Sequence, residues 1–199
     1  MNLRKRIDRI LYAPEIELDG EAYTNSYKLN DVNSIQKFIN EKLRLNDKGK
    51  NIAYENLDTG DKIIISNNSA GKLASHFRDG VAYQKTIAHI PQIIENMKFL
   101  EEMAPDKENA KYGKYSYYIT GVKIDGEPYT ILSTVGYNKN GVYYDQNLFK
   151  GTSEEVFEQA KKETDSKYDR LSEILKNTEK RRLEPEPSHC RGYSNRLYP

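Results

Sequence analysis

The chain has 199 residues, of which 31% are charged and 37% hydrophobic, a size and composition that suit one soluble domain with appendages. Its 31 Lys and Arg nearly cancel its 30 Asp and Glu, which argues against a high-affinity DNA-binding protein but not against an enzyme that contacts RNA briefly. The single cysteine excludes an internal disulfide, and no apolar run approaches the length that spans a bilayer, so a cytoplasmic protein is predicted, although a delivered effector would look the same.

Residues 1–50 are predicted to form an N-terminal helical region. Leu3 to Tyr12 is a candidate short helix, and Asp19-Gly20 is a candidate hairpin turn. Asp31 is predicted to be the N-cap of a further helix, which carries apolar residues at helical spacing: Val32, Ile35, Phe38, Ile39 and Leu43.

Residues 51–150 are predicted to form the α+β core. The core is predicted to begin with a hairpin whose strands are NIAYENL and DKIIIS, joined at DTG. A helix should follow, with Ser69 as its cap and Gly80 just after its end. A second helical stretch is predicted from about Tyr83 to Asn96, limited by Pro91, which is expected in the first turn of a renewed helix. The segment MKFLEEMAP is ambiguous between a helix end and a short edge strand.

Tyr115 to Leu148 is predicted to be a three-stranded antiparallel meander. Asp125-Gly126 and Asn140-Gly141 are typical of tight hairpin turns, and the strands are rich in β-branched and aromatic residues. Eight of the 16 tyrosines lie between Tyr112 and Tyr144, so this sheet could supply both core and a working surface.

Residues 151–181 are predicted to form one long amphipathic helix that folds back on the meander, and residues 182–199 a flexible tail. Thr152 and Glu155 form a capping-box pattern, and apolar residues then recur every three or four positions. His189 and Cys190 in the tail lack a scaffold that would fix a nucleophile's geometry, so a catalytic role for them is discounted.

The first candidate site combines Lys72 and His76, with Ser69 nearby. Residues four apart share one face of a helix, and a cation beside an imidazole lowers its pKa, which would leave His76 as a neutral general base. Lys72 could then stabilise a pentacoordinate phosphate. The alternative is a solvated helix face that happens to carry a histidine.

The second candidate site lies at the end of the last meander strand, where Tyr143 and Asp145 should share one face and Tyr144 and Gln146 the other. A tyrosine beside an amide could hold a base or a phosphate, and plain packing is equally compatible with the pattern. His89, among apolar neighbours, is predicted to be a packed histidine. No metal-binding or cofactor-binding motif is present, so neither a metal nor a cofactor is predicted.

The order of these features resembles a known group of domains. Five segments in order make up the resemblance: the strand ending IIISN, the helix with Lys72 and His76, PQIIENMKFL, VKIDGEPY and YYDQNL. The chain resembles phage-associated nuclease-like domains. These occur in large polyvalent proteins and at the C-termini of head-morphogenesis proteins, within the barnase–EndoU–colicin–RelE-like group. The resemblance covers about Asp61 to Phe149.

This resemblance implies an α+β fold with helices packed on a curved antiparallel sheet and a metal-independent, RNA-cleaving site. Carried onto this chain, it offers Lys72 and His76 from the helix and Tyr144, Asp145 and Gln146 from the last strand. Together with the local patterns, the predicted catalytic residues are His76, Lys72 and Tyr144, and the predicted substrate-binding residues are Ser69, Tyr117, Asp145 and Gln146. Similar domains have Tyr-Asp-His where this chain has Tyr144-Asp145-Gln146, which leaves only His76 for proton transfer. The prediction is therefore a toxin-like ribonuclease domain. The alternative is a non-catalytic module that binds a phage protein or acts as an inhibitor. The oligomeric state is left open.

Overall fold

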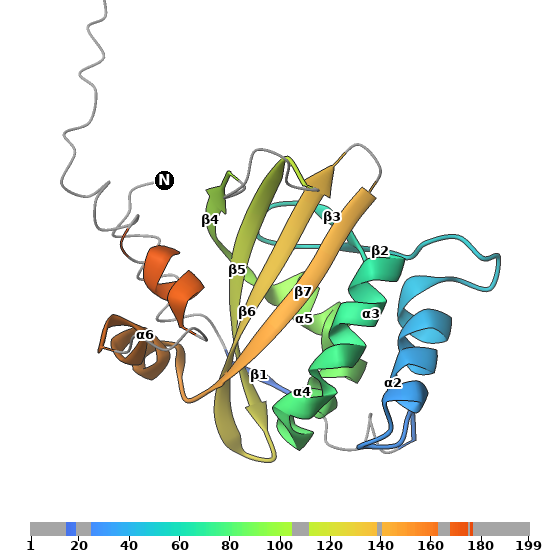
Figure 1. Ribbon diagram of the computed structural model, residues 1–199, viewed down its shortest axis with the longest axis horizontal. Helices are drawn as coiled ribbons and strands as arrows, with labels where there is room; N and C mark the ends of the chain where they lie inside the picture. Colours follow the sequence, from blue (N-terminus) through green and yellow to red (C-terminus); the bar gives the residue numbers. More distant parts are fainter. Residues whose placement is uncertain are drawn as a thin grey trace, which may run out of the picture.

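One open, mixed β-sheet with helices on both of its faces organises the protein, an α+β fold (Figure 1). The computed structural model describes residues 15–18, 25–104, 112–138, 141–162, 168–174 and 176. The sheet order is β1-β5-β6-β7, and β4 also pairs with β5. The strands are β1 (Ile16–Glu17), β4 (Lys98–Met103), β5 (Lys114–Ile124), β6 (Glu127–Asn138) and β7 (Gly141–Lys150).

The predicted meander is confirmed as β5, β6 and β7, each antiparallel to the next. Asp125 and Gly126 have φ of 55° and 80°, the two positive values that a two-residue hairpin turn requires. The sheet as a whole is not purely antiparallel, because β1 pairs in parallel with β5. The ambiguous segment after Asn96 is the strand β4, antiparallel to β5. The predicted helix at 3–12 and turn at 19–20 lie outside the described residues.

The predicted Asp31 cap is confirmed. Its carboxylate accepts hydrogen bonds from the backbone N–H groups of Asn33 and Ser34 and starts α2 (Val32–Phe38). A π-helical turn, Ile39–Arg44, extends this helix. The two-stranded hairpin β2 (Ala53–Glu55) and β3 (Lys62–Ile64) follows, shorter than the sequence predicted.

The next helix, α3 (Asn67–Ser75), is capped by Ser66 and not by Ser69 as predicted. Ser66 has the extended backbone of an N-cap, and its hydroxyl accepts the N–H of Ser69, which lies inside the first helical turn. The chain continues through a 3₁₀ turn (His76–Asp79) and Gly80 into α4 (Val81–Thr86). A second 3₁₀ turn (Ile87–His89) then leads into α5 (Ile90–Asn96), which has the predicted proline in its first turn.

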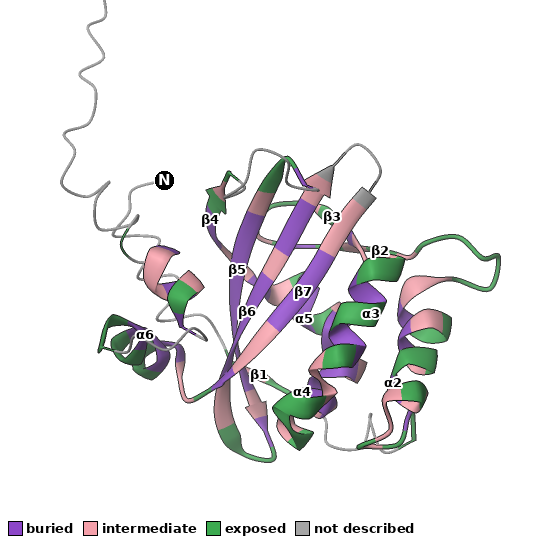
Figure 2. Cartoon of the chain, in the orientation of Figure 1, coloured by how far each residue is buried: buried purple, intermediate pink, exposed green. Residues whose placement is uncertain are grey.

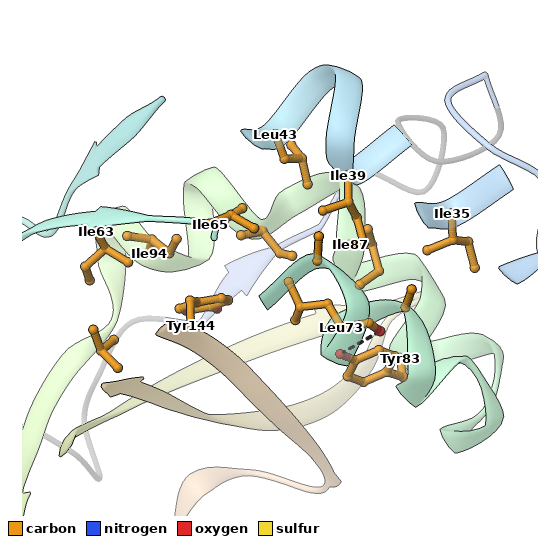
Figure 3. Close-up of a cluster of buried hydrophobic side chains, with 14 of the residues drawn as sticks. Ile35, Ile39, Leu43, Ile63, Ile65, Leu73, Tyr83, Ile87, Ile94 and Tyr144 are labelled. Atoms are coloured by element: carbon orange, nitrogen blue, oxygen red, sulfur yellow. Dashed lines mark hydrogen bonds between the residues drawn. The ribbon is translucent and has the colours of Figure 1, made fainter. Parts of the chain in front are cut away.

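Side chains on the two faces of the sheet enter different apolar clusters. On one face, Tyr118, Val135 and Tyr144 pack against α2, α3, α4 and α5 in the largest cluster, which Figure 3 shows. The helix α2 contributes Ile35 to it, and the π-helical turn that follows contributes Ile39 and Leu43. Residues before and after position 50 therefore share one core. Burial follows this layering: the strands are buried along much of their length, whereas the helices expose their outer faces (Figure 2).

The other face of the sheet is covered by α6 (Ser153–Lys162) and by the helical residues of 168–174. The capping box is confirmed, since Thr152 N–H donates to Glu155 and Glu155 N–H donates to Thr152. The single long helix is wrong. In one helix residues 160 and 172 would lie about 18 Å apart, yet Ser172 Oγ lies 2.5 Å from the carbonyl oxygen of Ala160. Residues 168–174 therefore lie beside α6 and do not continue its axis.

The predicted folding back of this apolar stripe on the meander is confirmed. Phe157, Ala160 and Leu171 share a cluster with Ile119 and Phe149 of the sheet. No helix in the described part of the chain is long and apolar enough to cross a membrane.

Candidate functional site

The C-terminal end of α3 meets the edge strand β7 at the candidate site. β7 is the outer strand of its sheet, and the backbone N–H of Tyr144 donates to Ser69 Oγ of α3 at 2.9 Å. The helix thereby satisfies an edge group that would otherwise lack a partner. The same docking carries His76, at the end of α3, to the side of β7.

His76 and Asp145 form the centre of the site. Nε2 of His76 lies 3.5 Å from Oδ1 of Asp145, within ion-pair distance, and each of these two buried atoms has no hydrogen-bond partner among the described residues. Nδ1 of the same ring lies 2.7 Å from Oδ2 of Asp79, whose side chain is 50% exposed. One imidazole thus stands between a buried and a surface carboxylate.

Two tyrosines complete the surroundings. Tyr143 donates its hydroxyl hydrogen to Oδ2 of Asp145 at 3.1 Å, so both carboxylate oxygens of Asp145 have a polar neighbour. Burial and the nearby Asp145 charge raise the pKa of Tyr143, which keeps this hydroxyl protonated and able to donate. The ring of Tyr83 lies 5.4 Å from the His76 ring and closes the inner side of the site.

The charge on His76 is governed by the carboxylates and not by the lysine. The close contact with the Asp145 carboxylate and its charge, together with the contact with Asp79, raise the pKa of His76 above 6.5, against the lowering effects of burial and Lys72. The predicted direction was therefore wrong. Lys72 acts on His76, but it is outweighed because the carboxylates contact the ring directly. A raised pKa favours the imidazolium, a proton donor.

We expect the His76 resonances to titrate above pH 6.5 in an NMR experiment, and the Asp145→Asn variant to titrate lower than the wild type. The raised pKa also makes the free energy of unfolding depend on pH, because protonation of His76 is coupled to folding. A raised pKa adds stability that is complete below the unfolded-state pKa and is lost as pH rises through the folded-state pKa. The stability difference between wild type and His76→Asn should accordingly be larger at pH 5.5 than at pH 8.5. Equal differences at both pH values would contradict the ion pair.

The remaining predicted residues are packed inside the protein. The buried residues are Ser69, Tyr117, Tyr144 and Gln146, each with a relative exposure of 4% or less. Tyr144 donates to Gln146 Oε1 at 2.9 Å, and Gln146 donates to Thr86 Oγ1 at 2.7 Å. Tyr117 belongs to the apolar cluster beneath α6, with the Arg170 guanidinium 5.5 Å from its ring centroid. These side chains hold elements together and present no surface to a substrate, so the expected contacts of Tyr144 and Gln146 with a phosphate are not available here.

Position 145, and not 146, is the one that faces His76. Neighbouring residues of a strand point to opposite faces, so Gln146 enters the core while Asp145 approaches the end of α3. The sequence pattern placed Tyr143 and Asp145 on one face, and that pairing is observed. Asp79 was missed. Its position three residues after His76, in a turn that ends at Gly80, was the available signal.

Within the described ranges, no group of three or more His, Cys, Asp or Glu side chains is arranged to hold a metal ion. His89 is buried, with 7% relative exposure, as the sequence predicted. His189 and Cys190 lie outside the described residues.

Comparison with known families and proteins gives one match. Residues 30–145 match the model of the family described as large polyvalent protein-associated domain 3. The matched range begins just before α2 and ends at Asp145, so it contains α3, His76 and most of the meander. No curated protein and no solved structure matches the chain.

Proposed function

We propose, from the premise that this chain belongs to the large polyvalent protein-associated domain 3 family, that it is a phage-associated domain that cleaves RNA by proton transfer from His76. The membership agrees with the kind of phage-associated domain that the sequence resembles. The observation that carries the proposal is the His76–Asp145 pair, built from residues 69 positions apart and joined at 3.5 Å.

The chemistry follows from the charge of that pair. In metal-independent RNA cleavage the ribose 2′-oxygen attacks phosphorus, and the bond from phosphorus to the 5′-oxygen breaks. The imidazolium of His76 would give its proton to the departing 5′-oxygen, while the 2′-hydroxyl proton passes to solvent. The products are a 2′,3′-cyclic phosphate and a 5′-hydroxyl.

Neighbouring side chains support this role. Asp145 holds the ring through Nε2, and Tyr143 fixes the second oxygen of that carboxylate. Lys72 is exposed one helical turn before His76, where a cation could neutralise a phosphate oxygen. The assignment of His76 as acid replaces the general base that the sequence suggested, because its pKa is raised.

The test is an incubation of purified protein with total tRNA and rRNA in excess chelator, beside His76→Asn prepared in the same way. We expect cleavage by the wild type and a loss of about 100-fold or more in the variant, the usual contribution of a positioned proton donor. Lys72→Gln should weaken cleavage, whereas Lys37→Gln, an exposed lysine on α2, should not. Intact RNA at high enzyme excess, or equal cutting by His76→Asn, would overturn the proposal and favour a non-catalytic, protein-binding module.

A further inference from the structure

The surface side of His76 is closed by a single carboxylate. Nε2 is buried against Asp145, which leaves Nδ1 as the ring nitrogen that faces a half-exposed group. That nitrogen contacts Asp79 Oδ2 at 2.7 Å, and the Asp79 side chain is 50% exposed. An exposed carboxylate therefore occupies the hydrogen-bonding position at Nδ1.

We infer that Asp79 occupies the place of an oxyanion of the substrate, and that a phosphate group binds His76 Nδ1 by displacing the Asp79 carboxylate. This inference rests on the proposed function and adds a residue to it. Asp79 does not take part in the chemistry; it competes with the ligand and selects for groups that carry a full negative charge.

The contacts of Asp79 make it easy to displace. In the described part of the chain, His76 is the only hydrogen-bond or ion-pair partner of the Asp79 side chain, and an ion pair at the surface contributes little to stability. The 3₁₀ turn ends at Gly80, whose φ of 107° is a conformation that L residues rarely adopt. The turn thus ends at a position that suits glycine, and the Asp79 carboxylate just before it remains exposed.

Charges around the turn favour an incoming anion once Asp79 has left. Lys72 lies one turn earlier on α3 and acts electrostatically on His76. Arg78 is exposed beside Asp79, with its guanidinium 5.7 Å from the Phe77 ring centroid. Asp145 keeps the imidazole charged from the buried side, so Nδ1 carries a hydrogen to donate.

The test measures binding and not cleavage. The His76 ring is followed by NMR while inorganic phosphate, or a short RNA made uncleavable by 2′-O-methyl groups, is added to the full chain. Asp79→Asn should bind both ligands about fivefold more tightly than the wild type, because a repelling charge near 4 Å is worth about 1 kcal/mol in water. Asp47→Asn, an exposed aspartate in a turn, is the matched control and should bind as the wild type does.

Two results would overturn the inference: unchanged affinity in Asp79→Asn, or undiminished binding in His76→Asn. The outcome is separable from the proposed function. If RNA stays intact but Asp79→Asn binds more tightly, the oxyanion site stands and the cleavage proposal fails. If RNA is cut but the affinity is unchanged, cleavage stands and the role of Asp79 fails.

Discussion

The Asn56→Ala variant should lose about 3 kcal/mol of unfolding free energy, a large part of the stability of a domain of this size. Asn56 is fully buried, and its side-chain N–H groups donate to the carbonyl oxygens of Ile94 and Met97 at 2.8 Å each. Its Oδ1 accepts from the N–H and the hydroxyl of Thr59.

These contacts make the β2–β3 turn a cap for α5. The last carbonyl groups of a helix have no partner within it, and α5 ends at Asn96. Asn56 and the backbone N–H of Leu57 supply donors to Ile94 and Glu95. Alanine would leave at least two buried acceptors without that partner, at about 1–3 kcal/mol each.

Chemical denaturation of the variant beside Asn46→Ala checks this prediction. Asn46 also accepts two backbone N–H groups through Oδ1, but it is exposed, so water can replace the lost contacts. We expect Asn46→Ala to cost about 1 kcal/mol or less. Similar losses in the two variants would show that the cap of α5 contributes little.

The parts of the fold that the sequence predicted are those fixed by local signals. The Asp125-Gly126 turn allows positive φ at both positions and sets the register of a long hairpin. Asp31 and the Thr152–Glu155 box each start a helix through contacts within one turn. Such features depend on neighbours in the chain. They can therefore be inferred without tertiary contacts.

Tertiary contacts decide the parts that were wrong. Phe157, Tyr168 and Leu171 have the spacing of one amphipathic helix, but the hydrogen bond from Ser172 to Ala160 places residues 168–174 beside α6. The short strand β1 has only two paired residues, too few for a periodic signal.

The candidate site shows the same division. Sequence spacing placed Lys72 and His76 on one helix face, and the alternation of β7 placed Tyr143 with Asp145. Nothing local shows that α3 docks on the edge of β7 and brings His76 to Asp145. The direction of the His76 pKa shift depends on that docking, which is why a lysine four residues away was a poor guide to it.

The Gln146→His variant should be destabilised by about 2 kcal/mol and should gain no RNA cleavage. The resemblance described above implies a histidine at this position, but residue 146 of this chain enters the core, where Gln146 links Tyr144 to Thr86. A neutral imidazole cannot readily reproduce both contacts of the extended amide, and burying an unpaired polar group costs about 1–3 kcal/mol. Because burial lowers the pKa of a histidine, the loss should grow as pH falls below about 6.5.

Denaturation at pH 8 and pH 5.5, with the cleavage assay at both, measures this prediction. The matched control is Asn147→His, one residue along β7, where the side chain is partly exposed and a change should cost about 0.5 kcal/mol or less. If Gln146→His were as stable as the control and cut RNA faster than the wild type, residue 146 would have to face the substrate. The assignment of Asp145 as the partner of His76 would then be wrong.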